Sequence, residues 1–202
     1  MTATIVANGL KDFVAYFEAL PEMAAEAAYL AVNDASRDTV PLLKRTMTKQ
    51  VNFPKGYLSP ERLSVRRKAT KATLEAVISG RDRPTSLARF AAGATPQNTR
   101  RRPITVRVKA NKDTRLDRAF LVQLKNNNIG LAIRLPAGQE PDRAYRPVQL
   151  TRRGGQAQNV WLLYGPSVDQ VMQGVIPDVS DEISDMISKN FLRQFNRVTI
   201  RG

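Results

Sequence analysis

The sequence of 202 residues contains no cysteine and no histidine. Without cysteine, the chain has no disulfide framework and no thiolate nucleophile. Without histidine, an acid–base enzyme would depend on other side chains, chiefly the 18 Asp and Glu residues. The two absences exclude thiol chemistry and leave little for general acid–base catalysis.

Motifs of catalytic and nucleotide-binding sites are also missing. The sequence has no Gly-x-x-x-x-Gly-Lys-Ser/Thr phosphate loop, no Gly-x-Ser-x-Gly nucleophile elbow and no dinucleotide fingerprint. One group of carboxylates fits either a metal ion or the positive end of a helix dipole, and we favour the dipole. This group is Asp178, Asp181, Glu182 and Asp185. We therefore predict no enzymatic activity, no metal site and no cofactor.

Long hydrophobic runs are absent as well. No stretch of the sequence approaches the roughly 20 uncharged apolar residues of a membrane span. The first residues lack the basic start and apolar core of a signal peptide. We expect synthesis in the cytosol and no membrane partner. A hydrophobic content of 42% suits one folded domain spanning residues 1–202.

Positive charge is what the sequence has in excess. It contains 32 Lys and Arg against 18 Asp and Glu, a net charge of +14. Residues 61–118 hold 16 Lys and Arg against 5 Asp and Glu, whereas residues 1–60 are neutral and residues 119–202 carry a net +3. Such a basic, loop-rich segment predicts contact with a polyanion.

The candidate contact residues form two runs in this segment. Arginine forks fit phosphate oxygens, and a single aromatic residue, Phe90, offers little for base stacking. Motifs for base-specific readout are missing, so we predict contact with phosphates regardless of sequence. A solvated surface or an acidic protein neighbour would also explain the charge, and we favour the polyanion. The two runs are Arg66, Arg67 and Lys68, and Arg100, Arg101 and Arg102.

The last part of the chain predicts a long amphipathic helix that starts at Pro177. Acidic residues occupy the first turns of this helix and basic residues occupy its last turns, as the helix dipole favours. Its apolar positions are Val179, Ile183, Met186, Ile187, Phe191, Phe195 and Val198. Before it, residues 160–164 predict a buried strand, followed by a short separate helix. A structural or subunit-interface turn would join them, although an ordinary buried turn fits equally well; it comprises Tyr164, Gly165, Pro166 and Val168.

The start of the chain predicts two helices, a short one that ends before Pro21 and a longer one that begins there. Pro41 is expected to kink or end the longer helix. A band of small side chains on it would let another element approach closely, although helix propensity alone would also account for them. The band is Ala24, Ala27, Ala28, Ala31 and Ala35.

The middle of the chain predicts strands. Alternating apolar residues indicate strands at 63–65, 73–79 and 104–109, and a hairpin of residues 119–124 and 129–135. Residues 136–158, rich in proline and poor in periodic apolar residues, predict a surface loop. The order of helices, strands and a final helix predicts an α+β fold. An antiparallel sheet would pack against the N-terminal helices and the long C-terminal helix, with a basic extended loop region.

A family resemblance rests on three features of the sequence. Residues 118–126 are RAFLVQLKN, with an "AF-x-x-QLK" core before an apolar strand. This core, the strand ending in YGPSV at residues 164–168 and the long C-terminal helix resemble the minor tail protein Z, or tail-completion, family of long-tailed, lambda-like bacteriophages and prophages. The alanine-rich helix and the basic middle match in order, the latter in character only. The segment 136–158 departs from the compact form of the family.

The resemblance implies a structural virion protein of the neck or tail-completion complex, acting in tail assembly and head–tail joining. It implies a homo-oligomer, a hexameric ring around the DNA channel. The implied partners are a tail terminator, a head-closure or connector protein and the genomic DNA. The protein would occupy the virion tail or neck, and the host cytoplasm during assembly. From the residues alone, a sequence-independent nucleic-acid-binding module outside any particle is the alternative.

Overall fold

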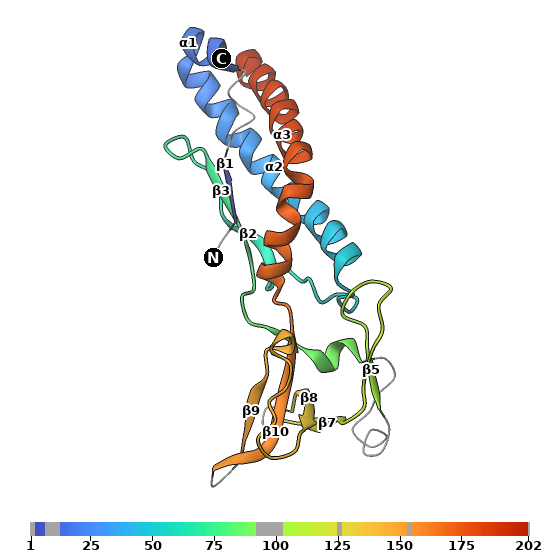
Figure 1. The fold of residues 1–202 in the computed structure, drawn as a ribbon. Helices are drawn as coiled ribbons and strands as arrows, with labels where there is room; N and C mark the ends of the chain where they lie inside the picture. The colour runs from blue at the N-terminus through green and yellow to red at the C-terminus, as the bar shows by residue number, and fades with distance from the viewer. Residues whose placement is uncertain (1–2, 7–12, 92–102, 125–126, 153–154, 202) are drawn as a thin grey trace. The chain divides into compact units, whose positions relative to one another are not determined.

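The computed structural model describes residues 3–6, 13–91, 103–124, 127–152 and 155–201 (Figure 1). The fold is α+β, with N-terminal helices, antiparallel sheets and a long C-terminal helix, as predicted. Contacts group the chain into two compact units. Unit 1 comprises Met1–Met47, Leu58–Asp82 and Val168–Gly202, and unit 2 comprises Thr48–Tyr57 and Arg83–Ser167. Each unit combines segments that are distant in the sequence.

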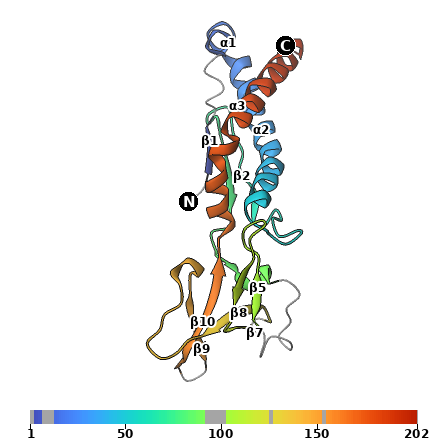
Figure 2. The same cartoon turned by 45° about the vertical axis from the view of Figure 1, so that its right-hand side comes forward.

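Unit 1 is built from long helices and a small antiparallel sheet. Figures 1 and 2 show the helices α2 and α3 running alongside each other, with the sheet against them. The sheet has the order β1-β3-β2, and α3 contacts β3. Its elements are α1 (Val14–Ala19), α2 (Pro21–Gln50, of which the last turn belongs to unit 2), α3 (Val168–Arg201), β1 (Ala3–Val6), β2 (Leu63–Arg67) and β3 (Glu75–Gly80).

The alanine band of α2 lies in the interior of unit 1. All five predicted alanines are fully buried, as is Val32 between them. Side chains this small leave the helix backbone close to whatever covers it, so burial supports close packing over propensity alone. Pro41 was expected to kink or end the helix; it lies inside α2, which continues to Gln50, so the helix does not end there. The neighbouring buried residues Leu42, Leu43 and Met47 anchor the helix beyond the proline.

Polar contacts hold the β2–β3 connection on α2. The Asn33 side chain donates to the carbonyl of Ala69 (3.0 Å) and accepts from the Ala69 N–H (2.8 Å). Next to it, Lys71 pairs with Glu26 at 2.7 Å, and this contact raises the pKa of Lys71. The amide pair satisfies both backbone groups of a buried residue, which makes it the stronger constraint.

The C-terminal helix is longer than predicted. It begins at Val168 rather than Pro177 and has no break, so the separate short helix does not exist. Pro177 therefore lies inside α3, where it removes one backbone hydrogen bond. Burial compensates for this loss: the helical spacing of apolar residues extends upstream of the proline. The buried positions are Val168, Val171, Met172, Val175, Val179, Ile183, Ile187, Phe191 and Phe195.

The earlier start of α3 changes the interpretation of its carboxylates. Asp169 is the acidic residue of the first turn. The four predicted dipole partners lie further along the helix, and the dipole effect fades beyond the first turn. Because α3 begins at Val168, their prediction as helix-start charges is wrong; their side chains are exposed. They are Asp178, Asp181, Glu182 and Asp185.

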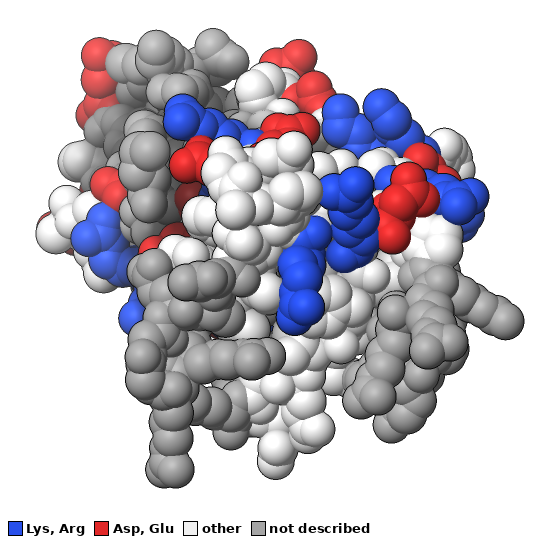
Figure 3. All heavy atoms as spheres, turned by 60° about the horizontal axis from the view of Figure 1, so that its bottom comes forward, with Lys and Arg blue, Asp and Glu red and all other residues white. Residues whose placement is uncertain are grey.

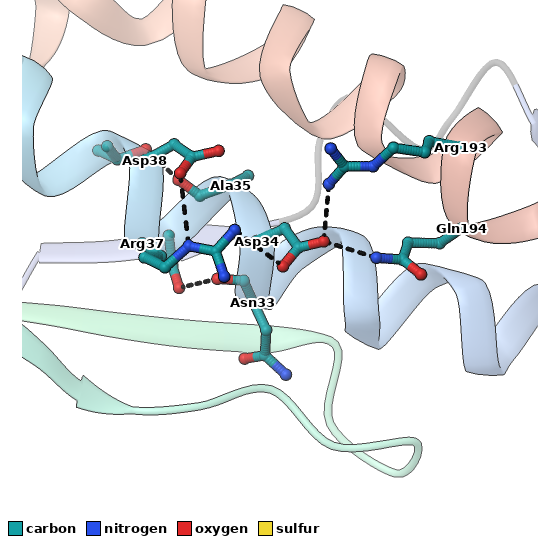
Figure 4. A network of polar contacts seen from close by, with 9 residues as sticks. Asn33, Asp34, Ala35, Arg37, Asp38, Arg193 and Gln194 are labelled. Carbon is teal, nitrogen blue, oxygen red and sulfur yellow. Dashed lines mark hydrogen bonds and ion pairs between the residues drawn. The ribbon is translucent and has the colours of Figure 1, made fainter. Parts of the chain in front are cut away.

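Asp34 fastens α2 to α3. Figure 4 shows its carboxylate pointing toward α3, where it accepts from Arg193 at 2.8 Å and from the Gln194 amide at 2.6 Å. Arg37 of α2 adds a contact at 3.3 Å. Asp34 is 18% exposed, so this network is partly shielded from water. Hydrogen bonds and ion pairs of Asp34 thus join the two helices beside their apolar faces.

A close backbone approach joins β3 to the start of α3. Gly80 ends β3, and a Cβ added there would lie 2.8 Å from both the Cα and the backbone N of Asp169. The Asp169 N–H also donates to the carbonyl of Arg81 at 3.1 Å. Real Cβ atoms do not come this close to backbone, so only glycine fits without a shift of the helix.

We therefore expect Gly80→Ala to destabilise the protein by about 1–3 kcal/mol, the usual cost of overpacking. A lower melting temperature by calorimetry would show it. The matched control is Gly174→Ala in α3, where an added Cβ meets nothing within 4 Å. Alanine is the better helix former by about 0.5–1 kcal/mol, so the control is expected to be more stable than the wild type. Equal melting temperatures of Gly80→Ala and the wild type would contradict the close approach of Gly80 to the backbone of Asp169.

Unit 2 is built from strands. Its main sheet has the order β4-β10-β8-β7, with β9 paired to β10, and β5 and β6 form a separate two-stranded sheet. The predicted hairpin is present as β7 and β8. The elements are β4 (Thr85–Ser86), η2 (Leu87–Phe90), β5 (Ile104–Val106), β6 (Thr114–Leu116), β7 (Ala119–Gln123), β8 (Ile129–Arg134), η3 (Arg143–Tyr145), β9 (Val148–Arg152) and β10 (Gly155–Gly165).

The segment 136–158 is not the surface loop that the sequence predicted. It contains η3, all of β9 and the start of β10. Among the described strands β9 pairs with β10 alone, so a continuous apolar pattern is not required of it. The prolines at 141 and 147 lie outside both strands, which removes the objection to strand structure.

Candidate functional site

The net charge of the protein lies entirely in unit 2. Over the full sequence, unit 2 contains 18 Lys and Arg against 4 Asp and Glu, whereas unit 1 contains 14 of each. Among the described residues the counts are 13 against 4 in unit 2 and 13 against 13 in unit 1. The fold thus places a net +14 on one unit and none on the other, a sharper division than the sequence segments indicated.

Two acidic side chains of unit 2, Asp113 and Asp117, form ion pairs with arginines of the same unit. Asp113 binds Arg107 through two hydrogen bonds, at 2.5 and 3.0 Å, and these bonds lower the pKa of Asp113. Asp117 pairs with Arg115 at 2.8 Å. Figure 3 shows Lys and Arg side chains mixed with Asp and Glu, beside a surface of uncharged residues. The remaining cations of unit 2 lack enough acids to neutralise them.

The predicted contact residues do not form one group. Arg66, Arg67 and Lys68 belong to unit 1, at and beyond the end of β2. All three are exposed; Arg66 lies at a register shift between β2 and β3, and Arg67 pairs with Glu75 at 2.6 Å. The second run lies outside the described residues: it is Arg100, Arg101 and Arg102. Their assignment to polyanion contact stays a prediction.

The predicted turn lies where the chain passes from unit 2 to unit 1. Tyr164 and Gly165 end β10, where they pair with Ser86 and Thr85 of β4. Val168 is fully buried as the first residue of α3. A Cβ on Gly165 would lie 3.2 Å from Phe90 and 3.4 Å from Leu87, so glycine lets η2 approach the strand. The structure shows these residues to be buried or half-buried, which fits a structural turn, and their role at a subunit interface stays a prediction.

A pocket of about 290 Å³ opens beside this turn, within unit 2. Tyr164, Gly165 and Pro166 form one part of its wall, and Tyr145 of η3 forms another. Lys109 and Lys112 line it from the turn between β5 and β6, together with Thr114. Two lysines, two tyrosines and one threonine therefore surround a space that is otherwise lined by aliphatic residues and a glycine.

Backbone hydrogen bonds hold the pocket residues in place. The Lys112 N–H donates to the Lys109 carbonyl at 3.2 Å, and Asn111 between them has a left-handed φ of 62°. Lys109 also forms a β-bridge with Val51. On the other side, Asp142 caps η3 through the Ala144 N–H at 2.9 Å, which fixes the turn that carries Tyr145.

Sequence reasoning missed Lys109, Lys112 and Tyr145 as site residues. Lys109 was placed at the end of a strand, and Tyr145 lay in the segment interpreted as a loop. The Asp142 cap was a local signal for the turn at Tyr145. Tyr145 meets two lysines more than thirty positions earlier because η3 contacts β10 and the lysine turn bonds to residues 50–52, and sequence periodicity encodes neither contact.

The structure offers little for metal binding or membrane crossing. Among the described residues, no group of three or more acidic side chains is placed to hold a metal ion. In the same part of the chain, every helix is too short or too polar to cross a membrane. A second pocket, of about 460 Å³, lies in unit 1 between Glu26, Lys71 and Arg197, where both signs of charge meet.

Comparisons with models of protein families, with curated proteins and with solved structures found no match to this chain. Functional interpretation therefore rests on the residues and their arrangement.

Proposed function

We propose that the protein is a structural component of the neck or tail-completion complex of a long-tailed phage, in which unit 2 contacts DNA. The observation that carries the proposal is the division of charge, +14 on unit 2 and zero on unit 1. A solvated surface has no need to collect every excess charge on one unit. A polyanion bound by one unit, while the other contacts protein neighbours, accounts for the division.

Unit 1 has features suited to protein contacts. It exposes large apolar side chains on α1, on the residue after it and on the last turns of α3, and such side chains mark interaction sites when they are grouped. These are Tyr16 (39% exposed), Leu20 (43%), Leu192 (43%) and Ile200 (86%). The exposed carboxylates Asp181, Glu182 and Asp185 lie on the same helix. Heterologous contacts between two different surfaces close into a ring when the rotation between subunits closes, and a ring is the assembly that the family resemblance implies.

We expect the purified protein to form rings, visible by negative-stain electron microscopy, and virions lacking it to have defective tails or unjoined heads. Ile200→Asp places a charge on the most exposed of these apolar side chains, so it should reduce ring formation while leaving the melting temperature unchanged. A wild-type protein that stays monomeric and never enters particles would contradict the neck assignment.

A free nucleic-acid-binding module is the second candidate, and the charge of unit 2 favours it as strongly. The two candidates differ in assembly rather than in DNA contact. Tight, salt-sensitive DNA binding by a monomer that is absent from virions would favour the module. Rings that add to tail ends would favour the neck protein.

A further inference from the structure

The pocket of unit 2 has the chemistry of an anion site with an aromatic wall. Lys109 and Lys112 project from one turn, and lysine binds phosphate as a point charge. Tyr145 lines the pocket and is half-buried, and Tyr164 packs against the apolar cluster of Ala132, Val160 and Leu162 while also lining the pocket. A ligand with a phosphate and a flat ring would use both parts.

The electrostatics of the pocket favour an anion. Among the residues that the structure describes, none of those lining the pocket is acidic. The nearest carboxylate in the sequence, Asp113 between Lys112 and Thr114, is engaged by Arg107. Its negative charge is therefore compensated outside the pocket, and the two lysines remain to attract a ligand in a unit of strong positive charge.

The size of the pocket restricts the ligand. At about 290 Å³, its volume is near the lower end of the roughly 300–1,000 Å³ that small-molecule pockets occupy. A stacked duplex presents phosphates on a broad surface and keeps its bases inside, so it has nothing to insert. A single unpaired nucleotide presents one base and one phosphate together.

We propose that this pocket binds one nucleoside phosphate, with its phosphate on Lys109 and Lys112 and its base against Tyr145. The inference deepens the proposed DNA contact and rests on it for the source of the ligand, an unpaired nucleotide of a DNA strand. The other cations of unit 2 hold phosphates regardless of pairing, whereas the pocket selects an unstacked base.

The test compares a fluorescent oligothymidylate with a duplex of equal length, by anisotropy. Tyr145→Ala should weaken oligothymidylate binding on the order of tenfold, the effect of losing one base–aromatic stack, and leave duplex binding unchanged. Tyr145→Phe keeps the ring and should bind like the wild type. Lys109→Gln/Lys112→Gln changes two exposed side chains, so it keeps the fold and should also weaken oligothymidylate binding.

The source of the nucleotide is tested by competition with thymidine monophosphate. Displacement of oligothymidylate from the wild type would show that free nucleotides enter; no displacement, with the Tyr145→Ala effect intact, would show that the nucleotide enters as part of a strand. Equal loss of single-strand and duplex binding in Tyr145→Ala, or no loss at all, overturns the proposal. If Tyr145→Ala weakens only single-strand binding but the protein never forms rings, the nucleotide pocket is supported and the assignment to the phage neck is contradicted.

Discussion

Phe191→Asp should unfold unit 1 or leave it barely stable. Phe191 is fully buried in α3, with its ring 4.6 Å from Phe13, 6.0 Å from Tyr16 and 5.8 Å from Phe195. Removing a buried Phe side chain costs about 3–5 kcal/mol, and an unpaired carboxylate adds a desolvation penalty. A typical protein has only about 5–15 kcal/mol of stability in total. Loss of helical circular dichroism at room temperature would show the effect.

The neighbouring residue provides a matched control. Leu192 is 43% exposed on the same helix, so Leu192→Asp introduces the same charge one position away without burying it. We expect its stability to change by no more than about 0.5 kcal/mol. Similar melting of the two variants would mean that the buried face of α3 is placed wrongly.

Periodicity predicted the helices well because burial of one face determines them. The i, i+4 spacing that ends at Phe195 indicates which side of α3 is buried, and the alanine band indicates the buried side of α2. Local rules failed where burial overruled them. Pro41 was expected to kink or end one helix and Pro177 to start another, yet apolar residues on both sides of each proline keep the helix packed.

Edge strands and discontinuous units were harder to predict, for different physical reasons. β9 pairs with β10 alone among the described strands, so its sequence has no apolar run. The division of charge could not be seen in the sequence because residues 48–57 belong to unit 2, whereas residues 58–82, which follow them, belong to unit 1. The basic cluster at Arg66 thereby moves to the neutral unit. Only contacts between distant segments determine that regrouping.

The candidate pocket was beyond local sequence reasoning. The turn at Tyr164–Pro166 was singled out, but as a structural feature. Lys109 and Tyr145 meet there because the Lys109 turn bonds to residues 50–52 and η3 contacts β10. Long-range pairing of this kind leaves no periodic signal in the chain.

Neutralising cations of unit 2 should reduce DNA affinity more than the same change in unit 1. The quadruple variant Lys55→Gln/Arg83→Gln/Arg118→Gln/Arg134→Gln changes exposed side chains of unit 2 and leaves Lys109 and Lys112 intact. Each lost phosphate contact lowers the slope of log affinity against log salt by about 0.9. The slope should fall by up to about 3.6, and affinity for duplexes of unrelated sequence should fall alike, by orders of magnitude at low salt. Filter binding at several salt concentrations measures both.

The matched variant changes four exposed cations of unit 1: Arg66→Gln/Lys68→Gln/Lys189→Gln/Arg197→Gln. Because unit 1 has as many acids as cations, its field is weak and the variant should keep most of the salt dependence. Equal losses in the two quadruple variants would contradict the assignment of DNA contact to unit 2. In that case the double variant Arg66→Gln/Lys68→Gln decides whether the first of the predicted arginine-rich runs holds the phosphates. Retained affinity in that double variant would place the contact on Lys189 and Arg197 of α3 instead.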